Sequence, residues 1–189
     1  MSSTLLEQYA HAADEFGSRV PLIRDDQWQA PTPCSEWDVR GLVAHMVDEL
    51  RWVPYLVGGG RFGDAGDRFS SDPLGDDPKG AWGTAREQAW SAFTADGALD
   101  QHVWLSFGEV SARDYLWDLT VDLTIHAWDL ARGIGADDHL DAELVRRIFH
   151  ETEKDVDRLV ASGRFAPPVN VASGADLQTR TLALFGRRA

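Results

Sequence analysis

The sequence predicts an all-α protein, a bundle of helices with one short β excursion, and three observations support this prediction. Apolar residues recur in five segments at the three-to-four-residue spacing of amphipathic helices. Residues that favour helix starts, and glycines that favour helix ends, stand at the borders of several of these segments. Only residues 102–110 (HVWLSFGEV) alternate in the manner of a strand or hairpin.

The N-terminal half is expected to contain three helices. The first covers residues 4–24, with Gly17 inside the pattern and Pro21 near its end. A loop of turn-forming residues follows over 26–37. The second helix starts with Asp38 as N-cap and ends at the triple glycine 58–60, and the third covers 81–96.

The C-terminal half is expected to contain two long helices and one short one. Ser111 opens the fourth helix, and Gly133 and Gly135 close it. The fifth is predicted over residues 141–163, and the last short segment runs through LQTRTLALFG at the end of the chain. A bundle with a hairpin before its fourth helix therefore accounts for the whole pattern.

Composition restricts the function classes. A chain of 189 residues has the size of one domain, expected here as 1–189 with a core of 1–163 and a tail of 164–189. The net charge of −13 repels a phosphate backbone, so a nucleic-acid partner is not expected. No apolar run approaches the ~18–20 residues of a membrane span, and no secretory signal opens the chain. We therefore expect a cytoplasmic protein without a membrane partner.

The fourth predicted helix holds the strongest chemical signal. Asp122 and His126 are four residues apart, so their side chains meet on one face of a helix. At about 100° per residue, that face is the apolar stripe. Two polar groups therefore stand where a bundle buries leucines, and burial without partners costs several kcal/mol.

The second predicted helix repeats this pattern. His45 shares the apolar face of that helix, with Glu49 one turn further on. Two core-facing histidines and a carboxylate have the composition of a site for a divalent transition metal, and three protein ligands leave a position open for water or substrate. The alternative is a plain buried ion pair between Asp122 and His126, since nothing in the spacing brings His45 to that pair.

Two further features carry weaker signals. Residues 58–80 are rich in glycine and aspartate, which is typical of a solvated loop; the alternative is a lid over a site. Tryptophans lie beside the helices that carry the histidines. Core packing is the first interpretation of these rings, and an aromatic wall for an organic ligand is the second. The four tryptophans are Trp37, Trp52, Trp117 and Trp128.

Three stretches resemble a known family. PTPCSEWDVRGLVAHMV looks like the opening signature of the DinB-like metal-binding bundles, in the branch named for mycothiol-dependent maleylpyruvate isomerase, and DLTIHAWDLARGIG looks like the second signature of that branch. The closing stretch PPVNVASGADLQTRTLALFGRR resembles the tail of uncharacterised actinobacterial proteins of about this length. The resemblance implies a DinB-like four-helix bundle with a long crossover, here with an extra C-terminal helix.

The same resemblance implies a metal site. Its three ligands carry over to His45, Asp122 and His126, and the implied ion is zinc, with nickel accepted by the same donors. The isomerase has glutamate where this chain has Asp122, so the carboxylate here is set back by about one methylene. The isomerase also has a separate C-terminal domain for its thiol cofactor, for which the tail 164–189 is too short. We therefore do not expect maleylpyruvate isomerisation itself to transfer.

Two function classes follow. In the first, the protein is an enzyme, a thiol S-transferase or isomerase that uses a low-molecular-weight thiol such as mycothiol on a small electrophile. The catalytic candidates are then Glu49, Arg51 and Arg113, and the candidates for an aromatic wall are Trp52 and Tyr115. In the second, it is a non-catalytic metal- or ligand-binding protein, a stress-response protein or sensor. A homodimer is compatible with either class.

Overall fold

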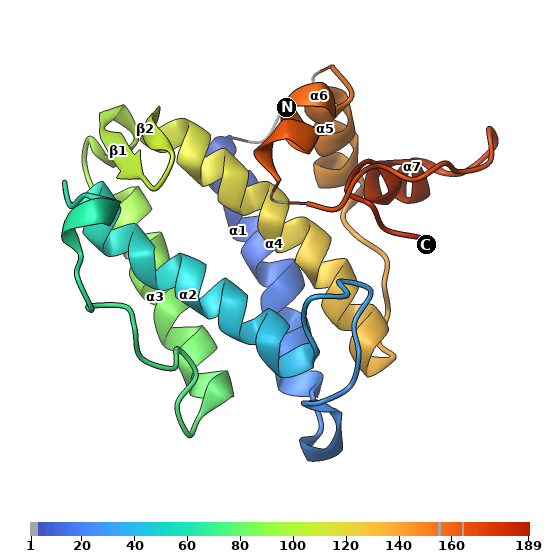
Figure 1. Cartoon of the computed structure of the whole chain (residues 1–189), viewed down its shortest axis with the longest axis horizontal. Coiled ribbons are helices and arrows are strands. Elements are labelled where there is room, and N and C mark those ends of the chain that lie inside the picture. Colours follow the sequence, from blue (N-terminus) through green and yellow to red (C-terminus); the bar gives the residue numbers. More distant parts are fainter. Residues whose placement is uncertain (1–3, 155, 164) are drawn as a thin grey trace.

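The computed structural model describes residues 4–154, 156–163 and 165–189 (Figure 1). This part of the chain contains seven α-helices and one antiparallel hairpin, which confirms the predicted all-α class. In chain order the elements are α1 (Leu5–Arg19), α2 (Val39–Val57), α3 (Pro78–Thr94), β1 (His102–Leu105), β2 (Gly108–Ser111), α4 (Ala112–Ile134), α5 (Ala142–Thr152), α6 (Val156–Ser162) and α7 (Leu177–Leu184).

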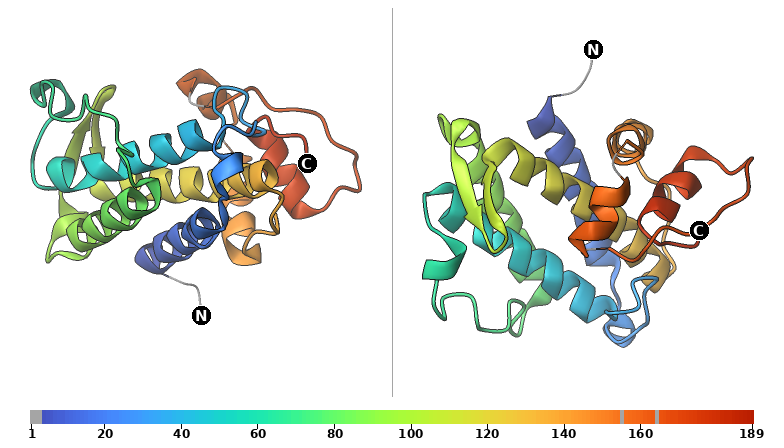
Figure 2. Two further views of the ribbon diagram at one scale, coloured as in Figure 1. Left: turned by 90° about the horizontal axis from the view of Figure 1, so that it is seen from below. Right: turned by 45° about the horizontal axis from the view of Figure 1, so that its top comes forward.

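The helices α1 to α4 form the bundle. α1 packs mainly against α4, α2 packs mainly against α3, and α2 also contacts α4. α2 and α3 run in the same direction, so the loop of residues 58–77 must return along the bundle to join them (Figure 1). This loop is the long crossover that the resemblance implied. α5, α6 and α7 lie together beside α4, at the end of the molecule away from β1 and β2 (Figures 1 and 2).

Two buried clusters hold these parts together. The main cluster fills the bundle with side chains from α1 to α4, including Phe16, Leu42 and Leu123. A second, smaller cluster joins the outer face of α4 to α5 and the C-terminal segment. Its buried members are Ile125, Trp128, Ile148, Leu182 and Phe185. α4 is therefore buried on both sides, which explains why so many of its residues lack solvent contact.

The helix ends follow the predicted capping chemistry. The side chain of Asp38 accepts a hydrogen bond from the Gly41 amide at 2.8 Å, and Ser111 caps α4 in the same way. Gly135 ends α4 with φ of 69°, a conformation that glycine adopts without strain. Gly133 instead lies inside α4, where an added Cβ would come within 3.2 Å of Val39 and Thr32.

The structure differs from the sequence prediction at two helices, one of which is shorter and one of which is divided. The first stops at Arg19 and tightens into a 3₁₀ turn at Val20–Leu22, where Pro21 has no amide hydrogen to continue the α-helix. The predicted helix 141–163 is two helices, α5 and α6. The sequence between them, 153–155, carries no apolar side chain that could hold a continuous helix against the core; residue 155 itself lies outside the described part.

The crossover loop lies along the bundle. Arg40 of α2 pairs with Asp72 at 3.0 Å, and Arg51 donates a hydrogen bond to the Ser71 hydroxyl at 3.3 Å. In Figure 1 the loop runs on the side of α2 and α3 that faces away from α4. Most of its side chains are exposed, in keeping with a solvated loop. Within the described residues, no helix has the length and apolar character needed to cross a bilayer.

Candidate metal centre

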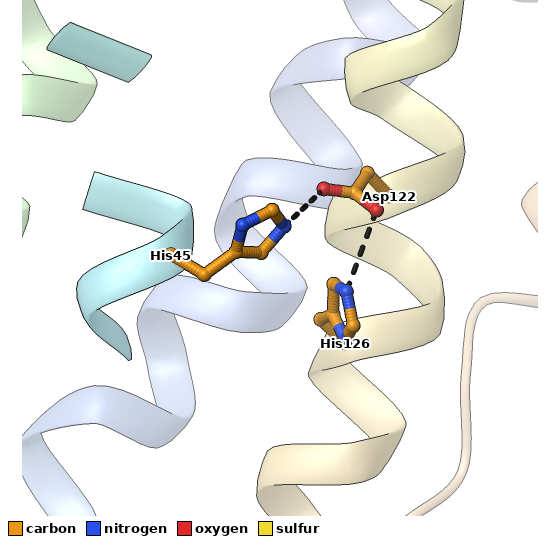
Figure 3. Close-up of side chains that lie close together, drawn as sticks. All are labelled: His45, Asp122 and His126. Carbon is orange, nitrogen blue, oxygen red and sulfur yellow. Dashed lines mark hydrogen bonds and ion pairs between the residues drawn. The ribbon is translucent and has the colours of Figure 1, made fainter. Parts of the chain in front are cut away.

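The candidate centre lies between α2 and α4, where one side chain from α2 meets two from α4 (Figure 3). His45 occupies the edge of the apolar face of α2, next to the fully buried Leu42 and Met46. Its Nε2 atom lies 3.0 Å from Oδ2 of Asp122. The structure thus brings His45 to the Asp122–His126 pair, a contact that the spacing alone left open.

Asp122 and His126 meet across one turn of α4. Oδ1 of Asp122 lies 3.4 Å from Nε2 of His126. One potential ligand atom from each of His45, Asp122 and His126 lies within 4.8 Å of those from the other two. The side chain of His126 is only 3% exposed, while those of His45 and Asp122 are 23% and 19% exposed. The cluster is therefore closed around His126 and partly open at His45 and Asp122.

The donor set and its spacing fit a divalent ion. Zinc binds imidazole nitrogen and carboxylate oxygen at about 2.0–2.2 Å, so two ligand atoms of a tetrahedral site lie ~3.3 Å apart. Nε2 of His45 lies 3.0 Å from Oδ2 of Asp122, and Nε2 of His126 lies 3.4 Å from Oδ1, so each nitrogen is close to that separation from one of the two carboxylate oxygens. Both imidazoles present Nε2 to the carboxylate. The chemistry of these three side chains therefore suits an ion placed between the two imidazoles and the carboxylate.

An aromatic ring closes one side of the cluster. Trp37, from the loop before α2, stacks on His45 with ring centroids 4.3 Å apart and also meets the ring of His126 edge-on at 5.5 Å. The sequence had placed Trp37 only among four tryptophans near the histidine helices. Phe165, from the segment before α7, lies 6.4 Å from His126 by ring centroids. These rings limit how each imidazole can turn.

A second carboxylate, which the sequence interpretation did not include, holds the far side of His126. Nδ1 of His126 lies 2.9 Å from Oδ2 of Asp129, which is fully buried. Asp129 is three residues beyond His126 on α4, so the i, i+3 spacing was the available signal. Asp129 also pairs with Arg187 near the C-terminus, at 2.7 Å. No local pattern links residues 58 positions apart.

The electrostatics of the cluster favour an ionised carboxylate. Burial alone lowers the pKa of His126, but Asp122 and Asp129 outweigh burial and raise it to about 9. Burial alone raises the pKa of Asp122, but the two histidines hold it well below its ordinary value. Without a metal, His126 is therefore protonated at neutral pH between two carboxylates.

The other candidate residues lie in different surroundings. Arg51 contacts Ser71 and Asp48, and its guanidinium lies 5.9 Å from the ring centre of Phe69. Trp52 packs on Phe62 and Phe69 of the crossover loop, with ring centroids 4.7 and 4.0 Å away.

The remaining candidates are Glu49 on α2 and Arg113 and Tyr115 on α4. Tyr115 is buried, and after burial itself the charge of Glu49 is the main cause that raises the pKa of the Tyr115 phenol. Glu49 is half-buried, one turn beyond His45 on α2. Arg113 is exposed in the first turn of α4, nine residues before Asp122 and hence about 14 Å away along the helix.

Fold and donor set together define a four-helix bundle with a candidate two-histidine, one-carboxylate centre. Residues 9–131 match the family described as the mycothiol maleylpyruvate isomerase N-terminal domain. The chain belongs to this family, as the resemblance of its motifs predicted. The match includes all three residues of the candidate centre and ends before α5.

Similar proteins come from two strains of Mycobacterium tuberculosis. Uncharacterized protein MT0763 and Uncharacterized protein Rv0738 are each 31% identical to this chain over 144 residues, which is 74% of this chain and 72% of theirs.

Among solved structures, the fold is similar to that of the mycothiol-dependent maleylpyruvate isomerase. The TM-score is 0.62 at 17% identity for that enzyme and 0.63 at 16% identity for a mutant of it. Each match covers 82% of this chain and 70% of the other. At this level of identity the likeness shows a shared fold.

Proposed function

We propose that this protein binds one divalent metal ion, with zinc as the first choice and nickel as the second, through His45, Asp122 and His126. The observation that carries the proposal is the convergence of these ligand atoms, within 4.8 Å, from two helices. Imidazole and carboxylate are the donors that suit such an ion, and three protein ligands leave a coordination position for a further molecule. The partial exposure of His45 and Asp122 lies on the side where that molecule would enter.

The further molecule is proposed to be a low-molecular-weight thiol of the mycothiol type, which is used on a small electrophile in an S-transfer or isomerisation reaction. The family name supports the choice of thiol. A bound divalent ion lowers the pKa of a coordinated thiol and so supplies a thiolate at neutral pH. Asp129 would hold His126 in place by accepting a hydrogen bond from its Nδ1–H, and Trp37 would keep water from one side of the cluster.

A second candidate function is a metal-dependent binding protein or sensor without turnover. The contacts of Arg51 favour it, since this guanidinium is engaged by Asp48 and the crossover loop rather than presented to a substrate. In this case the thiol or another small ligand would bind at the same centre and dissociate without being chemically altered.

Metal content tests the core of the proposal. Elemental analysis of untagged protein is expected to give close to one equivalent of zinc or nickel, which His126→Ala loses. His11→Ala is the matched control, since His11 is an exposed histidine on α1, and it should retain the metal. A wild-type protein that contains no metal, and that gains no thermal stability from added zinc, would contradict the proposal.

A cobalt-substituted sample separates the two functions. Mycothiol should add a sulfur-to-cobalt charge-transfer absorption that its S-methyl derivative does not produce. An enzyme would then consume an electrophile such as monochlorobimane or maleylpyruvate in a thiol-dependent reaction that His45→Ala abolishes. Thiol binding without consumption of any electrophile tested would favour the binding protein.

A further inference from the structure

A buried arginine from the C-terminal segment lies directly behind the candidate centre. Nη2 of Arg187 donates to Oδ2 of Asp129 at 2.7 Å, and Nε lies 3.1 Å from Oδ1. Nη1 donates to the backbone oxygen of Phe185 at 2.8 Å. Arg187 is 4% exposed and Asp129 is fully buried, so this two-point ion pair has no solvent to compete with it.

The carboxylate of Asp129 connects Arg187 to the centre. Its Oδ2 atom accepts from Arg187 on one side and lies 2.9 Å from Nδ1 of His126 on the other. A His126 imidazole whose Nδ1–H donates a hydrogen bond to Asp129 has only Nε2 left for a metal, and Nε2 is the atom that faces Asp122. The chain of contacts therefore runs from Arg187 through Asp129 and His126 to Asp122.

The segment that carries Arg187 is itself held firmly. Leu182 and Phe185 are buried against Trp128 of α4 and Ile148 of α5. The backbone amide of Arg187 donates to the Leu182 oxygen at 3.0 Å, which closes the turn after α7. Gly186 permits this turn with φ of 78°. Arg187 thus reaches Asp129 from a fixed position, outside the family domain that ends at residue 131.

We propose that the segment 177–187 helps to build the metal centre. In this scheme Arg187, acting through Asp129, orients the imidazole of His126 so that Nε2 points toward His45 and Asp122. The proposal rests on the proposed metal site. Arg187 and Asp129 are positioning residues in this scheme and do not touch the ion. Carboxylates behind ligating histidines orient the ring and raise its basicity, and their loss typically lowers metal affinity by 10–100-fold.

Two neighbouring arginines provide a matched pair of variants. Arg187→Met removes the buried cation, while Arg188→Met changes the next, exposed residue of the same segment. Chelator competition should show zinc affinity reduced about 10–100-fold in Arg187→Met and unchanged in Arg188→Met. The visible spectrum of the cobalt form should change only in Arg187→Met. Arg187→Lys keeps the charge without the two-point geometry and should restore part of the affinity.

The metal-free protein offers a readout that does not depend on the ion. The ¹⁵N and ¹H signals of the His126 ring report its Nδ1 hydrogen bond, and they should shift in Arg187→Met but not in Arg188→Met. If Arg187→Met fails to fold because Asp129 is left without its cation, the double variant Asp129→Asn/Arg187→Met removes both charges together. This double variant should fold and still bind zinc more weakly than the wild type.

Three results would overturn the proposal. The first is that folded Arg187→Met, or the double variant, binds zinc with wild-type affinity and shows an unchanged cobalt spectrum. The ion pair of Arg187 with Asp129 would then have only a structural role, and the proposed metal site would be unaffected. Unchanged ring signals of His126 in metal-free Arg187→Met would also count against it. A wild-type protein that binds no metal would remove the proposed function and this inference together.

Discussion

At the scale of single residues, His126 is the most constrained group of the site. It is 3% exposed in its side chain, and each of its ring nitrogens faces a different carboxylate. This arrangement explains how a polar side chain can occupy an apolar stripe, since both nitrogens are satisfied. The carboxylate of Asp122 reaches both histidines, at 3.0 Å from His45 and 3.4 Å from His126.

The pKa of His126 predicts that metal binding releases a proton. Its neighbours raise that pKa to about 9, so the metal-free side chain is protonated at about pH 8. A metal at Nε2 must displace this proton, and zinc affinity should therefore increase about tenfold per pH unit up to about pH 9. Calorimetry in buffers of different ionisation enthalpy should detect release of close to one proton. Binding that is independent of pH over this range would contradict the prediction.

At the scale of elements, α2 and α4 show what local sequence determines. The N-caps Asp38 and Ser111 and the terminal Gly135 were each predicted, because capping depends on contacts within a few residues. The break between α5 and α6 was not predicted. The helical spacing resumes after the break, and only packing against neighbouring elements decides whether the chain remains helical between them.

The cap of α2 gives a prediction for this element. Asp38→Ala removes the acceptor for the Gly41 amide and should lower the free energy of unfolding by about 1 kcal/mol. Asp38→Asn keeps a capping oxygen and should remain close to wild type. Urea unfolding measures both variants. Equal stability of Asp38→Ala and the wild type would show that the cap contributes nothing here.

At the scale of the whole molecule, the proposed metal joins two helices that are distant in the sequence. His45 and Asp122 are 77 residues apart, so an ion held by both connects α2 to α4 across the bundle. Such a ligand binds the folded chain and not the unfolded one, so it must stabilise the fold. The C-terminal segment adds a third part of the chain to the same place through Arg187.

This connection predicts a stabilisation that depends on both helices. Free zinc at 100 times its dissociation constant should raise the free energy of unfolding by about 2.7 kcal/mol. His45→Ala on α2 and His126→Ala on α4 should each lose most of this gain. His102→Ala, at an exposed histidine of β1, should keep it. The same gain in all three variants would place zinc elsewhere on the protein.

The helical class, the caps, the hairpin and the pairing of Asp122 with His126 can all be predicted from the sequence, because each depends on residues at most a few positions apart. His45 could be brought to that pair only through a family resemblance. The stacking of Trp37 on His45 and the ion pair of Arg187 with Asp129 become visible only in the folded chain. Such contacts arise from the packing of whole helices. Two residues that are 58 positions apart have no regular spacing by which their ion pair could be predicted from the sequence.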